Sequence, residues 1–341
     1  MIASLRLAHF RPYEERTFTF EPGLNLICGP NAVGKTTVLE ALYLLISGRS
    51  FRAQQLPECI RQGAESFFLE AAFLRHGISQ RLSFALSPHE KRLMYNQTAC
   101  PSLTALLGVL QGTILIPDDN QLLKGAPQGR RRYLDIQLAQ IDPLYVHHLS
   151  RYTRALTQRN ALLKSKSALA IEAWEAMLAV SGDYVMVERH KAVVELEIQV
   201  KALYQQLGGE SETISLLYKP SMTASTYRDQ LAKTRKRELD LGFTLQGPHR
   251  DELEICLNGK PARFFASEGQ QRTLISSLRM AEWRRLATHT GAQPLFLIDE
   301  VGLGLDSRRR ELLFQQIAQM GQVIMTATEP LTSLPLHTIP L

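Results

Sequence analysis

The residues best suited to chemistry form one short stretch near the start of the chain. Residues 29–36 read Gly-Pro-Asn-Ala-Val-Gly-Lys-Thr and match the phosphate-binding pattern G-x-x-x-x-G-K-[ST]. Glycines let such a loop turn its N–H groups toward an anion, and the next helix adds partial positive charge. In this pattern Lys35 reaches the β- and γ-phosphates and the Thr36 hydroxyl binds Mg²⁺. The predicted nucleotide contacts are Gly29, Pro30, Asn31, Ala32, Val33, Gly34, Lys35, Thr36 and Thr37.

Two adjacent carboxylates near the C-terminus could complete the same site. The apolar run at 295–298 ends in Asp299 and Glu300. In phosphate-binding-loop proteins such a strand holds Mg²⁺ and orients the attacking water. We predict that Asp299 stabilises the metal and that Glu300 is the catalytic base, with Lys35 as the second catalytic residue. The alternative is a buried strand that ends at a solvated acidic turn.

The elements around these residues predict an α/β fold. Residues 24–28 read as a buried strand and residues 37–45 as a helix, which is the context that the loop requires. A strand at 294–298, a helix at 307–320 and a strand at 322–326 give the order of a parallel sheet. Other strands are expected mainly in the first hundred residues. They lie at 2–7, 17–20, 67–74, 78–86, 91–95 and 112–117.

The middle of the chain is different in character. Between about residues 130 and 207 apolar residues recur at helical spacing, with breaks near Asp142 and at 165–167. Heptads are not sustained, so we expect a compact arm of antiparallel helices. We divide the chain into a first part of lobe I at 1–100, a helical arm (lobe II) at 101–220, and a C-terminal part at 221–341 that completes the nucleotide-binding head. The last part should hold a helix at 226–240, strands at 253–257 and 263–265, and a helix at 268–287, after a strand at 213–218.

Composition limits the class of protein. The chain has 341 residues, of which 45% are hydrophobic and 21% charged, as in soluble globular proteins. Its 39 Lys and Arg exceed 33 Asp and Glu, and this net charge of +6 favours a polyanionic partner. The four cysteines form no C-x-x-C pair, which argues against a zinc site and fits a reducing compartment. Without a long apolar run or a signal segment, we expect a cytoplasmic protein with no membrane partner.

A third segment points to a composite site. Residues 266–273 read Ala-Ser-Glu-Gly-Gln-Gln-Arg-Thr ahead of a long predicted helix, which Ser267 could cap. The segment resembles the signature motif of the ATP-binding-cassette superfamily, and residues 303–306 resemble its D-loop, ending in Asp306. This resemblance implies that signature residues meet the nucleotide of a second protomer: Ser267, Gly269 and Gln270. At the position of the superfamily's switch histidine this chain has Thr326, followed by Thr328.

Motifs outside the nucleotide site make the resemblance more specific. Residues 247–251 read Gly-Pro-His-Arg-Asp, and residues 124–132 contain K-G-x-P-x-x-R-R-R. Together with residues 7–13 and 48–52 they resemble, over essentially the whole chain, the RecF family of bacterial recombination-repair ATPases related to SMC proteins. The chain departs from the family pattern at Pro12, where Asn is usual, and at Glu268, where Gln is usual. Many members also have Asp-Asp where this chain has Asp299-Glu300. These departures remove no phosphate-binding or metal-binding group.

The resemblance implies a P-loop NTPase with an ABC/SMC-like ATPase head, ATP and Mg²⁺ as cofactors, and an inserted helical arm. Two protomers would enclose ATP, so that ATP binding drives homodimerisation and weak, DNA-dependent hydrolysis releases it. The family binds duplexes and single-strand/double-strand junctions and works with RecR and RecO to help load RecA at gaps. It takes part in replication restart and SOS induction. Two alternatives stay open: a transporter's nucleotide-binding subunit, and an ATP-dependent dimerising protein that does not bind DNA.

Clusters of basic residues supply candidate DNA contacts. Ion contacts with phosphates release counterions, so binding should weaken as salt rises. No aromatic-interleaved platform for stacking single strands is apparent, which favours contacts with the DNA backbone. The alternative for each cluster is a solvated helix face. The main candidates are Arg52, Arg130, Arg131, Arg132, Arg151 and Arg154, followed by Arg159, Lys164, Lys166, Lys233, Arg235, Lys236 and Arg237.

Overall fold

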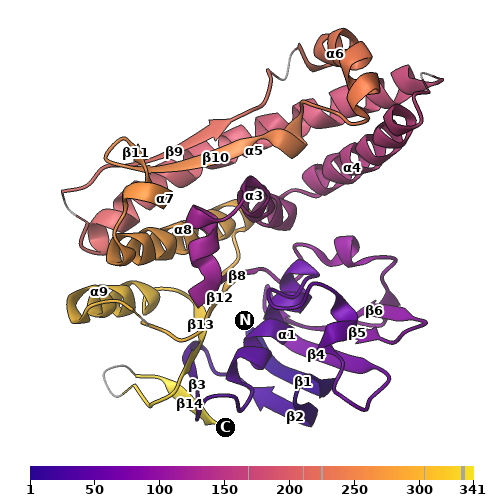
Figure 1. The fold of residues 1–341 in the computed structure, drawn as a ribbon. Coiled ribbons are helices and arrows are strands. Elements are labelled where there is room, and N and C mark those ends of the chain that lie inside the picture. The colour runs from indigo at the N-terminus through magenta and orange to yellow at the C-terminus, as the bar shows by residue number, and fades with distance from the viewer. Residues whose placement is uncertain (168, 210, 224–225, 303, 332–334) are drawn as a thin grey trace. The chain divides into compact units, whose positions relative to one another are not determined.

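The computed structural model describes residues 1–167, 169–209, 211–223, 226–302, 304–331 and 335–341. The chain divides into two compact units, which we describe separately (Figure 1). Unit 1 contains Met1–Asp119, Ala202–Glu210 and Glu268–Leu341, and unit 2 contains Asn120–Lys201 and Ser211–Ser267. The predicted boundaries at 100 and 220 are therefore displaced. Residues 101–119 pack within unit 1, whereas residues 221–267 pack with the helices of the arm.

Unit 1 contains a five-stranded parallel sheet in the order β14-β3-β13-β12-β8. Its inner strands are almost entirely buried, which explains why they read as continuous apolar runs. The predicted strands at 24–28, 294–298 and 322–326 are confirmed. Edge strand β14 is not predicted by the sequence, because it is four residues long and mostly exposed. The strands are β3 (Gly23–Cys28), β8 (Gly112–Leu115), β12 (Leu295–Ile298), β13 (Gln322–Ala327) and β14 (His337–Pro340).

A second, antiparallel sheet of unit 1 has six strands in the order β2-β1-β4-β5-β6-β7. One hydrophobic core joins the two sheets and helix α1 (Lys35–Ser47), with Leu42 of α1 packed among residues such as Phe84 and Leu297. Because α1 is covered on all sides, its sequence is apolar nearly all round. The strands are β1 (Ile2–Phe10), β2 (Tyr13–Thr19), β4 (Phe67–Arg75), β5 (Ile78–Leu86), β6 (Lys91–Tyr95) and β7 (Thr98–Ala99).

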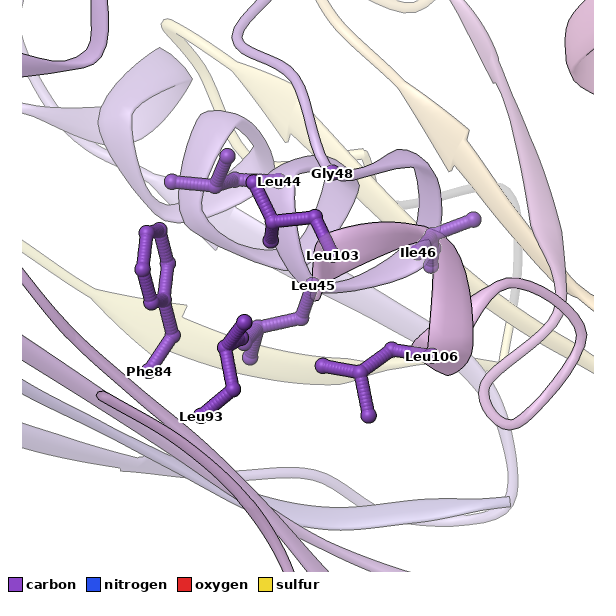
Figure 2. Close-up of a pocket in the computed structure, with 8 residues that line it drawn as sticks. All are labelled: Leu44, Leu45, Ile46, Gly48, Phe84, Leu93, Leu103 and Leu106. Carbon is purple, nitrogen blue, oxygen red and sulfur yellow. The ribbon is translucent and has the colours of Figure 1, made fainter. Parts of the chain in front are cut away.

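The end of α1 borders an apolar gap in this core (Figure 2). Its walls come from α1, the strands β5 and β6, and a 3₁₀ turn at Leu103–Leu106. The gap has no room for a water-sized molecule, so it is a packing feature and not a ligand site. Helices α8 (Glu268–Thr290) and α9 (Ser307–Ile317) complete unit 1, with 3₁₀ turns at Leu56–Cys59 and Pro117–Asn120.

Unit 2 combines long helices with a small sheet in the order β11-β10-β9. The predicted helix break near Asp142 is confirmed, because the Asp142 carboxylate accepts from the Leu144 N–H at 2.8 Å and caps the next helix. The helices are α2 (Gln121–Lys124), α3 (Pro127–Ile141), α4 (Pro143–Lys164), α5 (Ile171–Gln206), whose last turns belong to unit 1, α6 (Tyr227–Leu241) and α7 (Ala262–Phe265). The strands are β9 (Ile214–Lys219), β10 (Glu252–Leu257) and β11 (Lys260–Pro261), and a 3₁₀ turn spans Pro248–Arg250.

The predicted strand at 263–265 is wrong. The chain pairs with β10 only through Lys260 and Pro261 and then turns into α7. Proline has no N–H for a sheet and its fixed φ suits the start of a helix, so Pro261 ends the hairpin early. Across the described residues, no helix is both long and apolar enough to cross a membrane.

Candidate nucleotide-binding site

The phosphate-binding loop connects β3 to α1 in unit 1. Ala32 and Gly34 have positive φ values of 67° and 106°, which curl the backbone and turn successive N–H groups inward. A side chain at Gly34 would also collide with Tyr13, since a Cβ there would lie 2.7 Å from the Tyr13 hydroxyl. That hydroxyl donates to the Gly34 carbonyl at 3.2 Å. Tyr13, to which the sequence assigned no role in the site, therefore supports the loop from behind.

Lys35 places a cation inside this loop. Its side chain is almost fully buried, and its Nζ donates to the carbonyl oxygens of Gly29 at 2.7 Å and Pro30 at 2.6 Å. A buried ammonium beside free N–H groups at the start of α1 is a strong site for an anion. The residues present therefore fit the phosphate chain of a nucleotide.

Thr36 and Asp299 meet although they lie far apart in sequence. The Thr36 hydroxyl is 2.9 and 3.1 Å from the two carboxylate oxygens of Asp299. They meet because β13 lies between β3 and β12, and parallel strands end at the same edge. Hydroxyl and carboxylate oxygens suit Mg²⁺, which usually keeps water and phosphate ligands as well. Within the described chain, no cluster of three His, Cys, Asp or Glu residues is placed to hold a metal ion.

Thr326, predicted as a switch residue, holds both carboxylate residues in place. It lies fully buried in β13, and its hydroxyl donates to Asp299 Oδ1 at 2.7 Å and accepts from the Glu300 N–H at 2.8 Å. Glu300 has a positive φ of 51°, a strained conformation that this bond and its neighbours maintain. Thr328 is exposed and lies two residues past Thr326. Of the two threonines, Thr326 is therefore the one that positions Asp299 and Glu300.

Within unit 1, the part of the predicted signature that lies on α8 adjoins the predicted D-loop segment. A Cβ on Gly269 would lie 2.8 Å from Arg309, and Arg309 donates its backbone N–H to the carboxylate of Asp306 at 2.9 Å. Arg272 packs against Gly304 and pairs with Glu268 at 3.0 Å. Gly269 and Gln270 lie in the first turn of α8, Ser267 is the last residue of unit 2, and Leu303 of the D-loop lies outside the described residues.

A buried ion cluster anchors the middle of α8. Arg279 donates to the carboxylate of Asp119 at 2.5 and 2.9 Å and to Glu282 at 2.9 Å. Burial raises the pKa of Glu282, although Arg279 beside it opposes that shift. Removing one member would leave a buried charge without its partner, so this cluster fixes α8 firmly in unit 1.

Comparison with known proteins identifies the family. A model described as the RecF/RecN/SMC N terminal domain matches residues 1–333. The DNA replication and repair protein RecF of Protochlamydia amoebophila (strain UWE25) is 47% identical over 338 residues, which cover 96% of this chain and 94% of that protein. The chain belongs to the RecF family. A second member, RecF of Chlamydia abortus (strain DSM 27085 / S26/3), is 36% identical over 337 residues, which cover 96% of this chain and 91% of that protein.

Solved RecF structures share the fold. One, described as the recombination mediator protein RecF-ATP in the RecFOR pathway, has a TM-score of 0.91 at 27% identity and covers 98% of this chain and 93% of its own. Another, described as RecF-ATPrS in that pathway, has a TM-score of 0.89 at 27% identity, with coverage of 99% and 96%. The predicted family and its α/β, SMC-like ATPase fold are confirmed. The chain is thus a member of a family of DNA replication and repair proteins, and the transporter alternative falls away.

The RecF-family motif at 247–251 has a structural role in unit 2. Gly247 has a φ of 128°, and a Cβ there would lie 2.2 Å from the Tyr227 hydroxyl. His249 Nδ1 is 2.6 Å from the Tyr152 hydroxyl, and its Nε2 is 3.1 Å from the Thr244 carbonyl. Burial lowers the pKa of His249 to about 4, so the ring is neutral, accepts from Tyr152 and donates to Thr244. The motif therefore acts as a packed polar centre.

Two arginines of the K-G-x-P-x-x-R-R-R block also form contacts within unit 2. Arg130 is only 4% exposed and bonds both oxygens of Glu252 at 2.7 and 2.8 Å, as well as the Gly125 carbonyl at 2.8 Å. This burial argues against the predicted DNA contact of Arg130, because its donors are already bound. Arg131 is half-buried and donates to the Asp251 carbonyl at 2.8 Å. Arg132 is exposed.

The predicted DNA contact of Arg159 is wrong. Arg159 is fully buried and bonds Glu175 at 2.9 Å, Glu238 at 2.6 Å and the Thr244 hydroxyl at 2.8 Å. Arg235 is held by the carboxylates of Glu172 and Glu175, each at 2.6 Å. These two arginines therefore stabilise unit 2. The candidates that remain exposed there are Arg132, Arg151, Arg154, Lys164, Lys166, Lys233, Lys236 and Arg237.

Arg52 has an intermediate position in unit 1. Its side chain is about half exposed and lies 3.6 Å from the buried carboxylate of Glu40. Arg11 bonds the same carboxylate at 2.8 and 3.1 Å and so already neutralises most of its charge. Arg52 therefore stays available to a further anion and remains a candidate DNA contact.

Proposed function

We propose that this chain binds ATP with Mg²⁺ at the Gly29–Thr37 loop and uses it to dimerise on DNA during replication and repair. The observation that carries the proposal is the connected set of hydrogen bonds from Thr36 through Asp299 to Thr326 and Glu300 beside the loop. Such a set joins a phosphate site to a hard-cation site and a carboxylate base. The RecF structures described with ATP and ATPrS support this choice of nucleotide.

The proposed roles follow from the chemistry of each side chain. Lys35 neutralises the β- and γ-phosphates, while Thr36 and Asp299 hold the metal ion. When bound, Mg²⁺ screens the charge that develops on the phosphates. Glu300 accepts a proton from the attacking water at its carboxylate. Since Asp299 and Glu300 share Thr326, metal binding and base position are set together.

Dimerisation is proposed through the segments that carry the signature and the D-loop. Ser267 and Asp306 are exposed and Gly269 and Gln270 half-exposed, as residues that meet a second protomer should be. Each nucleotide would lie between the loop of one protomer and these residues of the other. ATP would then hold the dimer, and slow hydrolysis would release it. Weak, DNA-dependent ATPase activity is the expected result.

DNA is the proposed partner of the dimer in the cytoplasm. The exposed arginines Arg132, Arg151 and Arg154 suit the backbone of a duplex or of a single-strand/double-strand junction. The relatives' place in the RecFOR pathway supports RecO and RecR as further partners. In this scheme the chain marks gaps where RecA is loaded, which links it to replication restart and SOS induction.

The test combines two measurements on the full chain. Light scattering after size exclusion should show a dimer with ATP, and a monomer with ADP or no nucleotide. Binding to gapped duplex at low salt should be strongest with ATP. A chain that dimerises with ATP but ignores DNA would be an interaction protein, and a chain that stays monomeric with ATP would refute the dimerisation switch.

A further inference from the structure

Two adjacent phenylalanines on α7 of unit 2 face solvent. Phe264 is 69% exposed and Phe265 is 61% exposed, and their rings meet edge to face at 6.5 Å between centroids. Isolated exposed apolar residues are common, whereas contiguous exposed apolar surface is typical of interaction sites. Their exposure follows from the helical turn, in which Ala262 and Ala266 supply the buried contacts. In a strand the two rings would have pointed to opposite faces.

Two cations lie over these rings. Lys260 Nζ is 5.3 Å from the centroid of Phe265, and Arg263 Cζ is 4.4 Å from that of Phe264. The turn at Asn258-Gly259 and the short strand β11 deliver Lys260 to this place. Neither Lys260 nor Arg263 forms an ion pair with any residue that the structure describes. The patch therefore combines exposed rings with positive charge that the fold leaves unneutralised.

The carboxylates closest in sequence on β10 do not offset this charge. Glu252 pairs with Arg130 at 2.7 Å, and Glu254 pairs with Lys219 at 2.6 Å. The local excess of positive charge favours a polyanion over a neutral apolar protein surface. A polyanion that also offers flat rings to stack on is a nucleic acid with unstacked bases.

We propose that Lys260, Arg263, Phe264 and Phe265 form an aromatic platform that binds unstacked nucleotides of single-stranded DNA. The rings would stack on bases without regard to sequence, while the two cations contact the flanking phosphates. A duplex keeps its bases stacked inside and cannot use the rings. The platform therefore selects the single-stranded side of a junction. This inference rests on the proposed DNA-binding function and assigns part of it to a defined surface.

The test uses full-length chain and fluorescence anisotropy with labelled oligodeoxythymidine and with a blunt duplex of equal length. The double variant Phe264→Ala/Phe265→Ala should bind oligodeoxythymidine about tenfold or more weakly, because base–aromatic stacking is lost, with duplex affinity unchanged. The double variant Phe264→Tyr/Phe265→Tyr keeps the rings and should bind as the parent does. Phe243→Ala is the matched control, since Phe243 is also exposed in unit 2 with Arg250 over its ring at 5.5 Å.

The outcomes separate this platform from the broader proposal. If the parent chain binds oligodeoxythymidine and the double alanine variant binds it equally well, the platform is refuted while DNA binding stands. If the parent chain binds neither DNA, the proposed function fails and the platform fails with it. Loss of ATP-dependent dimerisation in the alanine variant, with oligodeoxythymidine binding intact, would assign the rings to a second copy of the chain. An unchanged thermal midpoint shows that the variant is folded.

Discussion

At the scale of single residues, the carboxylate of Asp299 is bound by two threonine hydroxyls, one from helix α1 and one from strand β13. Thr36 and Thr326 approach it at 2.9 and 2.7 Å, and Thr326 also accepts from the Glu300 N–H. The short side chain of Thr326 lets one hydroxyl bind the Asp299 carboxylate and the strained backbone of Glu300 at the same time. A histidine is larger than a threonine, so this chain positions Asp299 and Glu300, the proposed metal-binding residue and base, by a different group than the superfamily's switch histidine.

Thr326→Ala should lower ATP hydrolysis with little effect on ATP affinity. The variant removes one of the two hydroxyl bonds to Asp299 and leaves the Glu300 N–H without its bond to Thr326, and a hydrogen bond to a charged group contributes about 1.5–3 kcal/mol. We expect a fall in kcat of about tenfold or more. Steady-state phosphate release and nucleotide titration would measure the two effects. Thr326→Ser should restore the rate, and Thr328→Ala should leave it unchanged; an unchanged rate in Thr326→Ala would exclude the positioning role.

Variants of Lys35 and Glu300 should separate binding from hydrolysis. Lys35→Ala removes the buried cation of the loop, so we expect loss of both ATP binding and ATP-driven dimerisation. Glu300→Gln keeps the shape of the side chain but cannot accept the proton, so ATP should bind and the dimer should persist. Light scattering and phosphate release check both expectations. Hydrolysis at the normal rate by Glu300→Gln would show that another group is the base.

Asp183 on α5 should make stability depend on pH. Its Oδ1 is buried without a hydrogen-bond partner in the described chain, and burial raises its pKa from 3.8 to about 6. The folded chain therefore holds this proton more tightly than the unfolded chain. The stability that this provides is complete below pH 3.8 and is lost as pH rises through about 6.

Asp183→Asn should therefore stabilise the chain at pH 7 and not at pH 4. Because the carboxylate is only partly buried, we expect a gain of about 1 kcal/mol, or about 2 °C in Tm. Differential scanning calorimetry at the two pH values would measure it. Asp240→Asn, at an exposed position of α6, is the control. An equal gain at both pH values would show that ionisation is not the cause.

At the scale of elements, the turn that carries Gly247 joins three parts of unit 2. Its φ of 128° and the nearby Tyr152 and Tyr227 hydroxyls leave no room for a side chain. Gly247→Ala should destabilise unit 2 by about 2–4 kcal/mol, through backbone strain and overpacking. Hydrogen exchange should rise in peptides of unit 2, while exchange in peptides of the parallel sheet of unit 1 should stay unchanged. Gly259→Ala, where φ is 73° but no atom lies within 4 Å of a Cβ, should cost about 1 kcal/mol.

The sequence predicts best those elements that carry a long periodic pattern. The longer strands of the antiparallel sheet, the breaks in the helical arm and the strand before Asp299 are found where the pattern placed them. Short elements are decided by a few contacts, so β14 is missed and α7 is taken for a strand. In the site, motif spacing predicts Lys35, Thr36 and Asp299. The support from Tyr13 depends on how two sheets pack, which spacing alone does not reveal.

The arginines of unit 2 show more clearly that sequence patterns do not reveal long-range contacts. Arg130 and Arg159 look like their exposed neighbours in the sequence, yet both are buried against carboxylates that follow much later in the chain. A long-range ion pair leaves no local pattern. A run of arginines therefore predicts a charged region correctly but not which of its members face solvent.

At the scale of the whole molecule, the exposed arginines of unit 2 should set the salt dependence of DNA binding. Arg132→Ala, Arg151→Ala and Arg154→Ala combined should weaken duplex binding and reduce the slope of log affinity against log salt by about 0.9 for each phosphate that is no longer neutralised. Anisotropy across a salt series would measure the slope. Arg81→Ala, an exposed arginine of unit 1 at 68%, is the control. An unchanged slope in the triple variant would place the DNA-binding surface elsewhere.

The strand order of the parallel sheet also determines when, during synthesis of the chain, the nucleotide site can form. β3 is synthesised early, whereas its two neighbours, β13 and β14, are synthesised only after the last segment of unit 2. Asp299 and Thr326 likewise emerge only after unit 2 has been synthesised. A nascent or truncated chain can thus carry the basic surface of unit 2 before it can hold a nucleotide. The control by ATP that we propose therefore requires residues that are synthesised after unit 2.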